Sequence, residues 1–130
     1  MNYGDPFAIL DYYDEEEGGP FFSSPAVNEK YVIIGARDFR LHCIHRETGE
    51  RNWVFRTQDD VESSPIILGE KVIFSSADGR VYIANIDDGT ELWSYEVGSP
   101  IISSPAVANG KILIGADDGT LYCFGKKEEK

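Results

Sequence analysis

The sequence of 130 residues lacks several features that would assign it to a large class of proteins. No run of about 18 apolar residues occurs, so no segment can span a membrane as a helix. Residues 1–6 have neither a basic region nor an apolar core, so no signal peptide is expected there. No stretch shows the apolar period of a helix over about 11 residues or more. An all-β fold is therefore expected.

The sequence also has few basic residues. The chain carries 12 lysines and arginines against 23 aspartates and glutamates, which gives a formal net charge of −11. A phosphate backbone would be repelled over most of such a surface, so nucleic acid is not an expected partner. The acidic run Asp14–Glu17 is expected to be a solvated loop, with a docking patch for a basic partner as the alternative.

Motifs that carry catalysis are missing as well. The sequence has no HExxH pattern, no phosphate-binding glycine loop and no GxSxG elbow. His42, Cys43 and His45 form the one cluster of metal-ligand residue types, but their spacing matches no zinc motif. Adjacent side chains on a strand also point to opposite faces, so His42 and Cys43 should diverge. We expect no catalytic, cofactor-binding or metal-binding residue in this chain.

What the sequence does contain is a repeat. The segment Ser-Ser-Pro occurs at 23–25, 63–65 and 103–105, a period of 40 residues without drift. An aromatic residue stands ten positions before each segment, and an aspartate stands fifteen positions after its first serine. The aromatics are Tyr13, Trp53 and Trp93, the aspartates are Asp38, Asp78 and Asp118, and a further recurrent position holds His42, Tyr82 and Tyr122. A period of this length indicates a repeat architecture.

Each unit is predicted to form four short strands rich in Val, Ile, Tyr and Phe. In the second unit we expect them near residues 64–68, 71–76, 80–86 and 90–96. Asp78-Gly79 and Asp88-Gly89 predict tight two-residue turns, because glycine accepts the positive φ that such turns need. Four-stranded antiparallel units of about 40 residues are blades of a β-propeller. The expected fold is thus a partial propeller of about three blades.

The repeat also explains residues that could otherwise suggest a calcium site or a catalytic serine. Asp87, Asp88, Asp117 and Asp118 resemble calcium ligands, but calcium needs about six to eight oxygens from a loop that wraps the ion. Tight turns explain these aspartates, so calcium is not expected. The serines of Ser-Ser-Pro have no His-Asp partner, and we expect them on the innermost strand, where small side chains let the strands crowd the axis. His42 stands in the place of a tyrosine, which suggests a packing role.

The two cysteines, Cys43 and Cys123, occupy equivalent places two units apart. Stacked sheets are about 10 Å apart, whereas a disulfide needs Cα atoms within about 7 Å. An intrachain disulfide is therefore not expected. Ile83 stands at the same place in the middle unit, so both cysteines are expected in the apolar core.

The pattern resembles the quinoprotein-type repeat, often called the PQQ-like repeat after pyrroloquinoline quinone. The resemblance covers Ala8 to Phe124, whereas the Gly-His and Trp-Asp pairs of WD repeats are absent. The residues that carry it are Trp53-Val54-Phe55 after Glu47-Thr48-Gly49-Glu50, and residues 103–107 followed by 111–122. It implies that the recurrent tryptophan, at Trp53 and Trp93, lies on an outer strand and docks on the next blade, with Tyr13 as its substitute in the first unit.

This resemblance gives an expected domain organisation. The parts are an N-terminal lead at 1–7, three PQQ-like repeats over 8–125 and a charged tail at 126–130; the units lie near 17–56, 57–96 and 97–125, with 8–15 as an outer strand. Because propellers close with about four to eight blades, three units are either a piece of a longer protein or are completed by further copies. In the second case Ala8–Glu15 would pair with the Leu121 strand of another copy, and two copies would form a six-bladed ring.

The resemblance implies several functions. Its family includes quinone-dependent alcohol and glucose dehydrogenases, whose axial site commonly holds adjacent disulfide-bonded cysteines, an aspartate base and calcium; this sequence has no Cys-Cys pair, so we expect no cofactor. The family also includes bacterial propellers that bind proteins, and a non-catalytic protein-interaction scaffold is the leading hypothesis. The alternatives are a part of a quinoprotein dehydrogenase whose catalytic blades lie outside the chain, and a self-assembling structural unit. Partners would be proteins or further copies, bound through the blade faces and Ala8–Glu15, in the periplasm or cell envelope of a bacterium.

Overall fold

The computed structural model describes residues 23–101 and 103–125. Tyr13, the expected outer strand Ala8–Glu15, the acidic run Asp14–Glu17 and the tail at 126–130 lie outside the described residues. Every regular element in the described part is a β-strand, which confirms the all-β expectation. Within the same part, no helix is long and apolar enough to cross a membrane.

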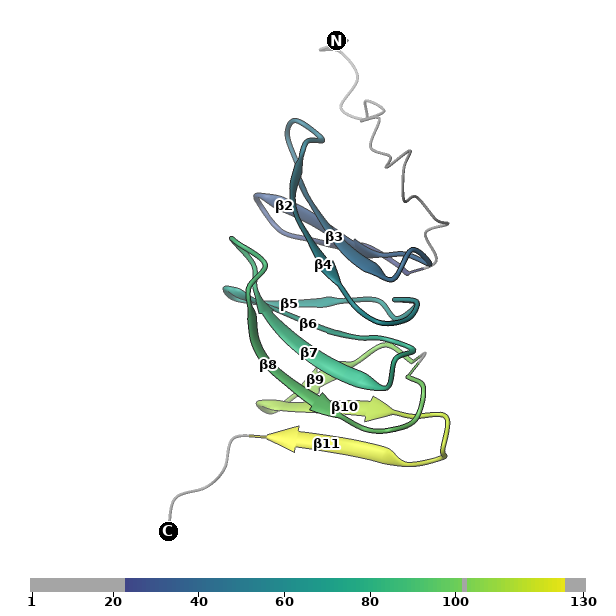
Figure 1. Ribbon diagram of the computed structural model, residues 1–130. Helices are drawn as coiled ribbons and strands as arrows, with labels where there is room; N and C mark the ends of the chain where they lie inside the picture. The colour runs from purple at the N-terminus through teal and green to yellow at the C-terminus, as the bar shows by residue number, and fades with distance from the viewer. Residues whose placement is uncertain (1–22, 102, 126–130) are drawn as a thin grey trace.

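The strands form three separate antiparallel sheets, which follow one another in chain order as a stack (Figure 1). The first sheet contains β1 (Ala26–Val27), β2 (Tyr31–Gly35), β3 (Arg40–His45) and β4 (Arg51–Arg56). The second contains β5 (Ile66–Leu68), β6 (Lys71–Ser75), β7 (Arg80–Asn85) and β8 (Glu91–Glu96). The third contains β9 (Ala106–Ala108), β10 (Lys111–Gly115) and β11 (Leu121–Gly125). Sheets of four, four and three strands, each ordered as in the chain, are blades of a partial propeller.

Alternation of burial along β2 distinguishes the two faces of the first sheet. In β2, Tyr31 and Ile33 are buried, whereas Val32 and Ile34 between them are half-buried. The main core lies between the first and second sheets, because one face of each meets the other. From the first sheet it contains Ile33, Leu41, Cys43 and Trp53, and from the second Val72, Phe74, Tyr82, Ala84 and Ile86. Val61, from the loop that joins the two sheets, is fully buried in the same core.

Aromatic rings join neighbouring sheets at equivalent places. The Phe55 ring of β4 makes T-shaped contacts with the rings of Phe74 and Tyr82 in the second sheet, with ring centroids 5.0 and 5.1 Å apart. One junction further on, Tyr95 of β8 lies 5.1 Å from Phe124 of β11. The outer-strand ring is thus equivalent at the two junctions, 40 residues apart, but its partner differs, because Phe124 stands at the place of Ala84.

The docking of Trp53 on the next blade is as the resemblance implied. Its indole Nε1 donates a hydrogen bond of 2.7 Å to the carbonyl oxygen of Ile86, and its side chain is 8 % exposed. Gly89 has φ 74°, and a Cβ there would lie 2.6 Å from the indole ring. Trp93, one unit later, is 37 % exposed and lies with its ring 5.5 Å from Phe124.

The turns are longer than the two residues expected from Asp-Gly. Ser76 donates its N–H to the Arg80 carbonyl, and Gly79 donates to the Ser76 carbonyl, so Ala77, Asp78 and Gly79 form a three-residue turn. Of these three residues, Gly79 alone has a positive φ, 87°, whereas a two-residue turn over Asp78-Gly79 needs a positive φ at Asp78 as well in type I′, or at Asp78 alone in type II′. The Gly89 turn is longer still, because Asn85 N donates to the carbonyl of Thr90. Two-residue turns were therefore the wrong expectation, although the glycines do adopt positive φ.

Gly35 and Gly115 occupy the same place in their units and offer a matched test of how closely the sheets are joined. A Cβ on Gly35 would lie 2.4 Å from the carbonyl oxygen of Val61 and 2.5 Å from its Cγ1, whereas a Cβ on Gly115 would meet only Ser103 Oγ at 3.5 Å. Urea unfolding should show that Gly35→Ala loses about 1–3 kcal/mol, because the backbone loop of Val61 must move. Gly115→Ala should change the midpoint little. Equal losses in both variants would contradict this account of the junction.

Candidate functional site

The recurrent serines form hydrogen bonds with backbone groups. The first serine of each Ser-Ser-Pro segment donates its hydroxyl to a carbonyl oxygen of the second strand in its own unit. The bonds run from Ser23 to Gly35 at 3.2 Å, from Ser63 to Ser75 at 2.8 Å and from Ser103 to Gly115 at 2.5 Å. These hydroxyls fix the segment that leads into each sheet, because they bond it to the second strand.

The second serine links one unit to the next. Ser24 N donates to Ser64 Oγ at 2.8 Å, and Ser64 N donates to Ser104 Oγ, also at 2.8 Å. We call this chain of bonds the serine relay. It lies just before β1, β5 and β9 rather than within them, which corrects the expectation that Ser-Ser-Pro is part of the innermost strand. Proline follows the serines and has no N–H to give to a sheet, so pairing begins one residue later.

The recurrent aspartate uses both carboxylate oxygens. One oxygen caps the turn by accepting the backbone N–H two residues on: Arg40 N for Asp38 at 3.0 Å, Arg80 N for Asp78 at 2.9 Å and Thr120 N for Asp118 at 2.8 Å. The other oxygen meets the aromatic residue four positions on. Its partners are His42 Nε2 at 2.8 Å, the Tyr82 hydroxyl at 2.5 Å and the Tyr122 hydroxyl at 3.2 Å. The aspartates are therefore turn caps with a second bond into the strand.

His42 takes the tyrosine's hydrogen bond as well as its place in the packing. Its side chain is fully buried, and burial lowers its pKa below the ordinary value of 6.5, although the Asp38 carboxylate acts in the opposite direction. The structure does not bring His42, Cys43 and His45 together. Cys43 faces the second sheet in the main core, and the His45 ring lies 5.7 Å from the Tyr31 ring.

The two cysteines differ in exposure. Cys43 is buried opposite Trp53 of β4, and burial raises the pKa of its thiol to about 12. Cys123 on β11 is exposed, so the expectation that both lie in the core was wrong for this residue. In the part of the chain that the structure describes, β11 is the last strand of its sheet, and no partner covers Cys123 as Trp53 covers Cys43.

The aspartates considered as calcium ligands are used in turns and junctions. Asp88 accepts bonds from Thr90 N and Thr90 Oγ1, and these bonds lower its pKa. Asp87 accepts the Tyr31 hydroxyl of the first sheet at 2.8 Å. Over residues 23–101 and 103–125, no group of three or more His, Cys, Asp or Glu side chains is arranged to hold a metal ion.

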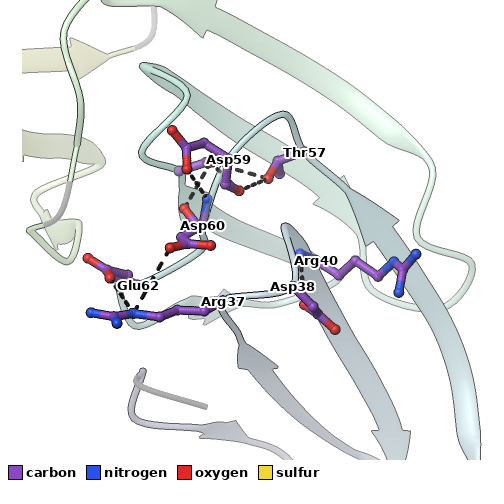
Figure 2. A network of polar contacts seen from close by, with 8 residues as sticks. Arg37, Asp38, Arg40, Thr57, Asp59, Asp60 and Glu62 are labelled. Carbon is purple, nitrogen blue, oxygen red and sulfur yellow. Dashed lines mark hydrogen bonds and ion pairs between the residues drawn. The ribbon is translucent and has the colours of Figure 1, made fainter. Parts of the chain in front are cut away.

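The turn at Asp38 has Arg37 on one side and Arg40 on the other. On the Arg37 side, Arg37 Nε lies 2.8 Å from Glu62 Oε1 and 4.0 Å from Asp60 Oδ2. Burial, and then the Asp59 carboxylate beside it, raises the pKa of Asp60. Figure 2 shows Arg37 reaching toward these carboxylates, whereas the Arg40 side chain extends away from them.

On the Arg40 side lie two adjoining hollows, which we call the arginine hollows. The larger, of about 520 Å³, is lined by Arg56, Thr57, Gln58, Arg80, Tyr82, Glu91 and Ser94. The smaller, of about 130 Å³, is lined by Asp38, Phe39, Arg40, Arg56 and Thr57. They share Arg56 and Thr57. Sequence reasoning missed this surface because it combines a turn of one unit with the loop into the next; the signal available was the departure of Phe39 and Arg56 from the repeat.

The buried His42 should make folding stability depend on pH. Its pKa is lowered in the folded chain, so below about pH 6.5 the unfolded chain binds more protons, and stability falls as the pH is lowered. The slope from this group can reach about 1.4 kcal/mol per pH unit. His42→Tyr introduces the residue of the other two units. In this variant the urea midpoint should change little between pH 6.5 and 5.5.

His42→Phe provides the control for that experiment. It also removes the titrating group, so its stability should be equally flat over this pH range. It leaves Asp38 Oδ2 without the bond from residue 42, and should be about 1–3 kcal/mol less stable than His42→Tyr. An unchanged pH slope in both variants would show that His42 is not the group responsible.

Comparison with known proteins relates this geometry to one family. The family model described as outer membrane protein assembly factor BamB matches residues 11–124. The structure of BamB from Moraxella catarrhalis is similar, with a TM-score of 0.70 and 23 % identity over 87 % of this chain and 35 % of that one. No curated protein sequence matches the chain.

Two dehydrogenases share the fold. Quinohemoprotein alcohol dehydrogenase from Comamonas testosteroni has a TM-score of 0.70 and 24 % identity over 87 % of this chain and 18 % of that one. The quinohemoprotein alcohol dehydrogenase ADHIIG from Pseudomonas putida HK5 has a TM-score of 0.66 and 21 % identity over 79 % and 17 %. The chain thus spans about a third of the length of the BamB structure and under a fifth of either dehydrogenase.

Proposed function

Because the chain belongs to the family of PQQ-like β-propellers described as outer membrane protein assembly factor BamB, we propose that it is a non-catalytic module that binds proteins. One observation carries this proposal. The recurrent polar side chains, namely the serines and the turn aspartates, bond within and between the blades. The groups left for recognition are the turn and loop residues that differ from unit to unit.

The description of the family also supports a partner class and a location. An outer membrane protein assembly factor acts on proteins destined for, or resident in, the bacterial outer membrane. We extend the proposal accordingly to a bacterial protein of the periplasm or cell envelope. Its organisation would be an N-terminal lead at 1–7, the repeats over 8–125 and the charged tail at 126–130.

Site-specific crosslinking tests the proposal. A photoreactive phenylalanine analogue replaces either Phe39 or Leu68, which are 47 % and 49 % exposed and belong to different loops and strands. The full chain is expressed in a Gram-negative bacterium and irradiated, and the crosslinked protein is identified by mass spectrometry. We expect a specific crosslink from at least one position to an outer-membrane protein or to a protein of its assembly machinery. Crosslinks to neither class would contradict the proposal.

A second candidate is part of a quinoprotein dehydrogenase, which the fold of the two quinohemoprotein structures favours. Titration of the purified chain with pyrroloquinoline quinone and calcium, while the quinone absorbance is followed, tests whether the chain itself holds the cofactor. The protein-binding proposal expects no stoichiometric complex. A complex of one quinone per chain would support the dehydrogenase instead.

Self-association is the third candidate, favoured by apolar exposure on the later strands. Leu92 and Tyr95 of β8 are 51 % and 46 % exposed, and Leu121 of β11 is 69 % exposed. In this candidate the blade faces and the strand Ala8–Glu15 join further copies. It predicts that light scattering at several concentrations shows a stable dimer or trimer. The chain without residues 1–16 should form a smaller oligomer. The same number of copies for both chains would contradict this candidate.

A further inference from the structure

The sequence has one Asn-Gly pair, and it forms the turn between β9 and β10. Ala108 pairs directly with Lys111, so Asn109 and Gly110 are the two residues of this turn. Their φ angles are 51° and 74°, the two positive values of a type I′ turn, which Asn-Gly favours. Both residues are exposed, and a Cβ placed on Gly110 would have no atom within 4 Å beyond its chain neighbours. Solvent therefore reaches this turn.

The three Asp-Gly pairs of the chain provide a comparison. In each of them the glycine N–H donates to a backbone carbonyl: Gly79 to Ser76 at 3.1 Å, Gly89 to Asn85 at 2.8 Å and Gly119 to Ala116 at 3.1 Å. The aspartate before each glycine is also engaged, because its carboxylate accepts the N–H of Arg80, Thr90 or Thr120. By contrast, no described residue forms a hydrogen bond with the Asn109 side chain or with the Gly110 N–H.

The other described asparagines are held as well. Asn28 Oδ1 accepts the N–H groups of Lys30 and Tyr31 at 2.8 and 2.7 Å. Asn85 Oδ1 accepts Asp87 N at 2.8 Å, and Asn52 Nδ2 donates to the Asp87 carbonyl at 3.1 Å. The residues that follow these three asparagines all have side chains, which crowd the backbone nitrogen next to the amide: Glu29, Trp53 and Ile86. Asn109 thus combines a free amide with a following nitrogen that is neither crowded nor bonded.

We propose that Asn109 is a modification site, at which the side-chain amide is lost spontaneously in the folded protein. The Gly110 nitrogen attacks Cγ of Asn109, the new bond closes a succinimide ring, and the bond from Cγ to Nδ2 breaks. The proton that Gly110 gives up leaves with Nδ2 as ammonia. A water molecule then opens the ring, adding a hydroxyl to one ring carbonyl and a proton to the ring nitrogen. Opening at Cγ gives aspartate, and opening at the backbone carbonyl gives isoaspartate.

The hairpin can open to permit the attack. β9 pairs with β10 through Ala106, Val107 and Ala108, and it is the edge strand of the third sheet as described. Exposed turns next to such short edge strands belong to the parts of a fold that open most readily. The reaction therefore needs no unfolding of the cores between the sheets.

The two products affect the hairpin differently. Aspartate tolerates the positive φ of position 109, so the type I′ turn can persist. Isoaspartate adds a carbon to the backbone between Ala108 and Lys111, and these residues can no longer oppose each other across a two-residue turn. Either product adds a negative charge to a chain that already carries −11. The modification does not depend on what the chain binds.

Mass spectrometry of the full chain tests the proposal. The folded protein is incubated in mildly alkaline buffer, sampled over time and digested with trypsin. The tryptic peptide over 81–111 contains Asn85 as well as Asn109, so fragmentation compares the two residues in the same molecule. Asn109 should convert from amide to acid at least about tenfold faster than Asn85, a difference of about 1.4 kcal/mol in activation free energy. An isoaspartyl methyltransferase with labelled S-adenosylmethionine should label the incubated chain.

Asn109→Gly provides the matched control. A Gly-Gly pair keeps both positive φ angles of the turn and removes the amide, so the variant should fold and take up little methyl label. Urea provides a second comparison. Unfolding releases the N–H groups of Gly79, Gly89 and Gly119, so the Asp-Gly pairs should form isoaspartate faster in urea than in the folded chain.

Several results would overturn the inference. These are an unchanged Asn109 amide in the folded chain, reaction of Asn85 at the same rate, or equal methyl label in Asn109→Gly. Equal formation of isoaspartate at the Asp-Gly pairs with and without urea would show that hydrogen bonds do not protect them, and the comparison that singles out Asn109 would fail.

Discussion

A sheet of four short strands cannot bury apolar residues on both faces by itself, and the rest of this structure follows from that constraint. Ile33 and Leu41 leave water because the second sheet covers them, and Phe74 does so because the first sheet covers it. Fully burying a side chain of this kind is worth about 1.5–3 kcal/mol. Trp53 and Val61 complete the junction from the outer strand and from the connecting loop, so the unit of stability is the contact between sheets rather than the sheet.

This explains which features could be read from the sequence. The period of 40 residues, the strands and the glycine positions recur, and each depends on residues close in the chain. The docking of Trp53 came from resemblance, and the structure adds its partner, the Ile86 carbonyl. The length of the turns was misjudged because Asp78-Gly79 is compatible with more than one turn, and the bond from Ser76 to Arg80 decides between them.

The candidate site was harder to foresee than the fold. Cys123 occupies the same place in the repeat as Cys43, yet its exposure depends on whether a neighbouring strand covers it. The arginine hollows combine Phe39 and Arg56 with Arg80 of the next unit, and a periodic pattern does not display such a combination. Repetition reveals the scaffold, whereas the features particular to one unit lie where the repetition fails. Phe39, which replaces the glycine of the other two units, lies in a turn and is not part of the cores between the sheets.

The serine relay carries a consequence for how such a chain can grow. Each bond joins a backbone N–H of one unit to a hydroxyl of the next, so each unit supplies the donor on one side and the acceptor on the other. A copy of the unit inserted anywhere in the series would find both its bonds already provided. Duplication therefore lengthens the stack without new interface chemistry, as in other arrays that are stabilised between nearest neighbours. Afterwards each copy is free to diverge at its own turns.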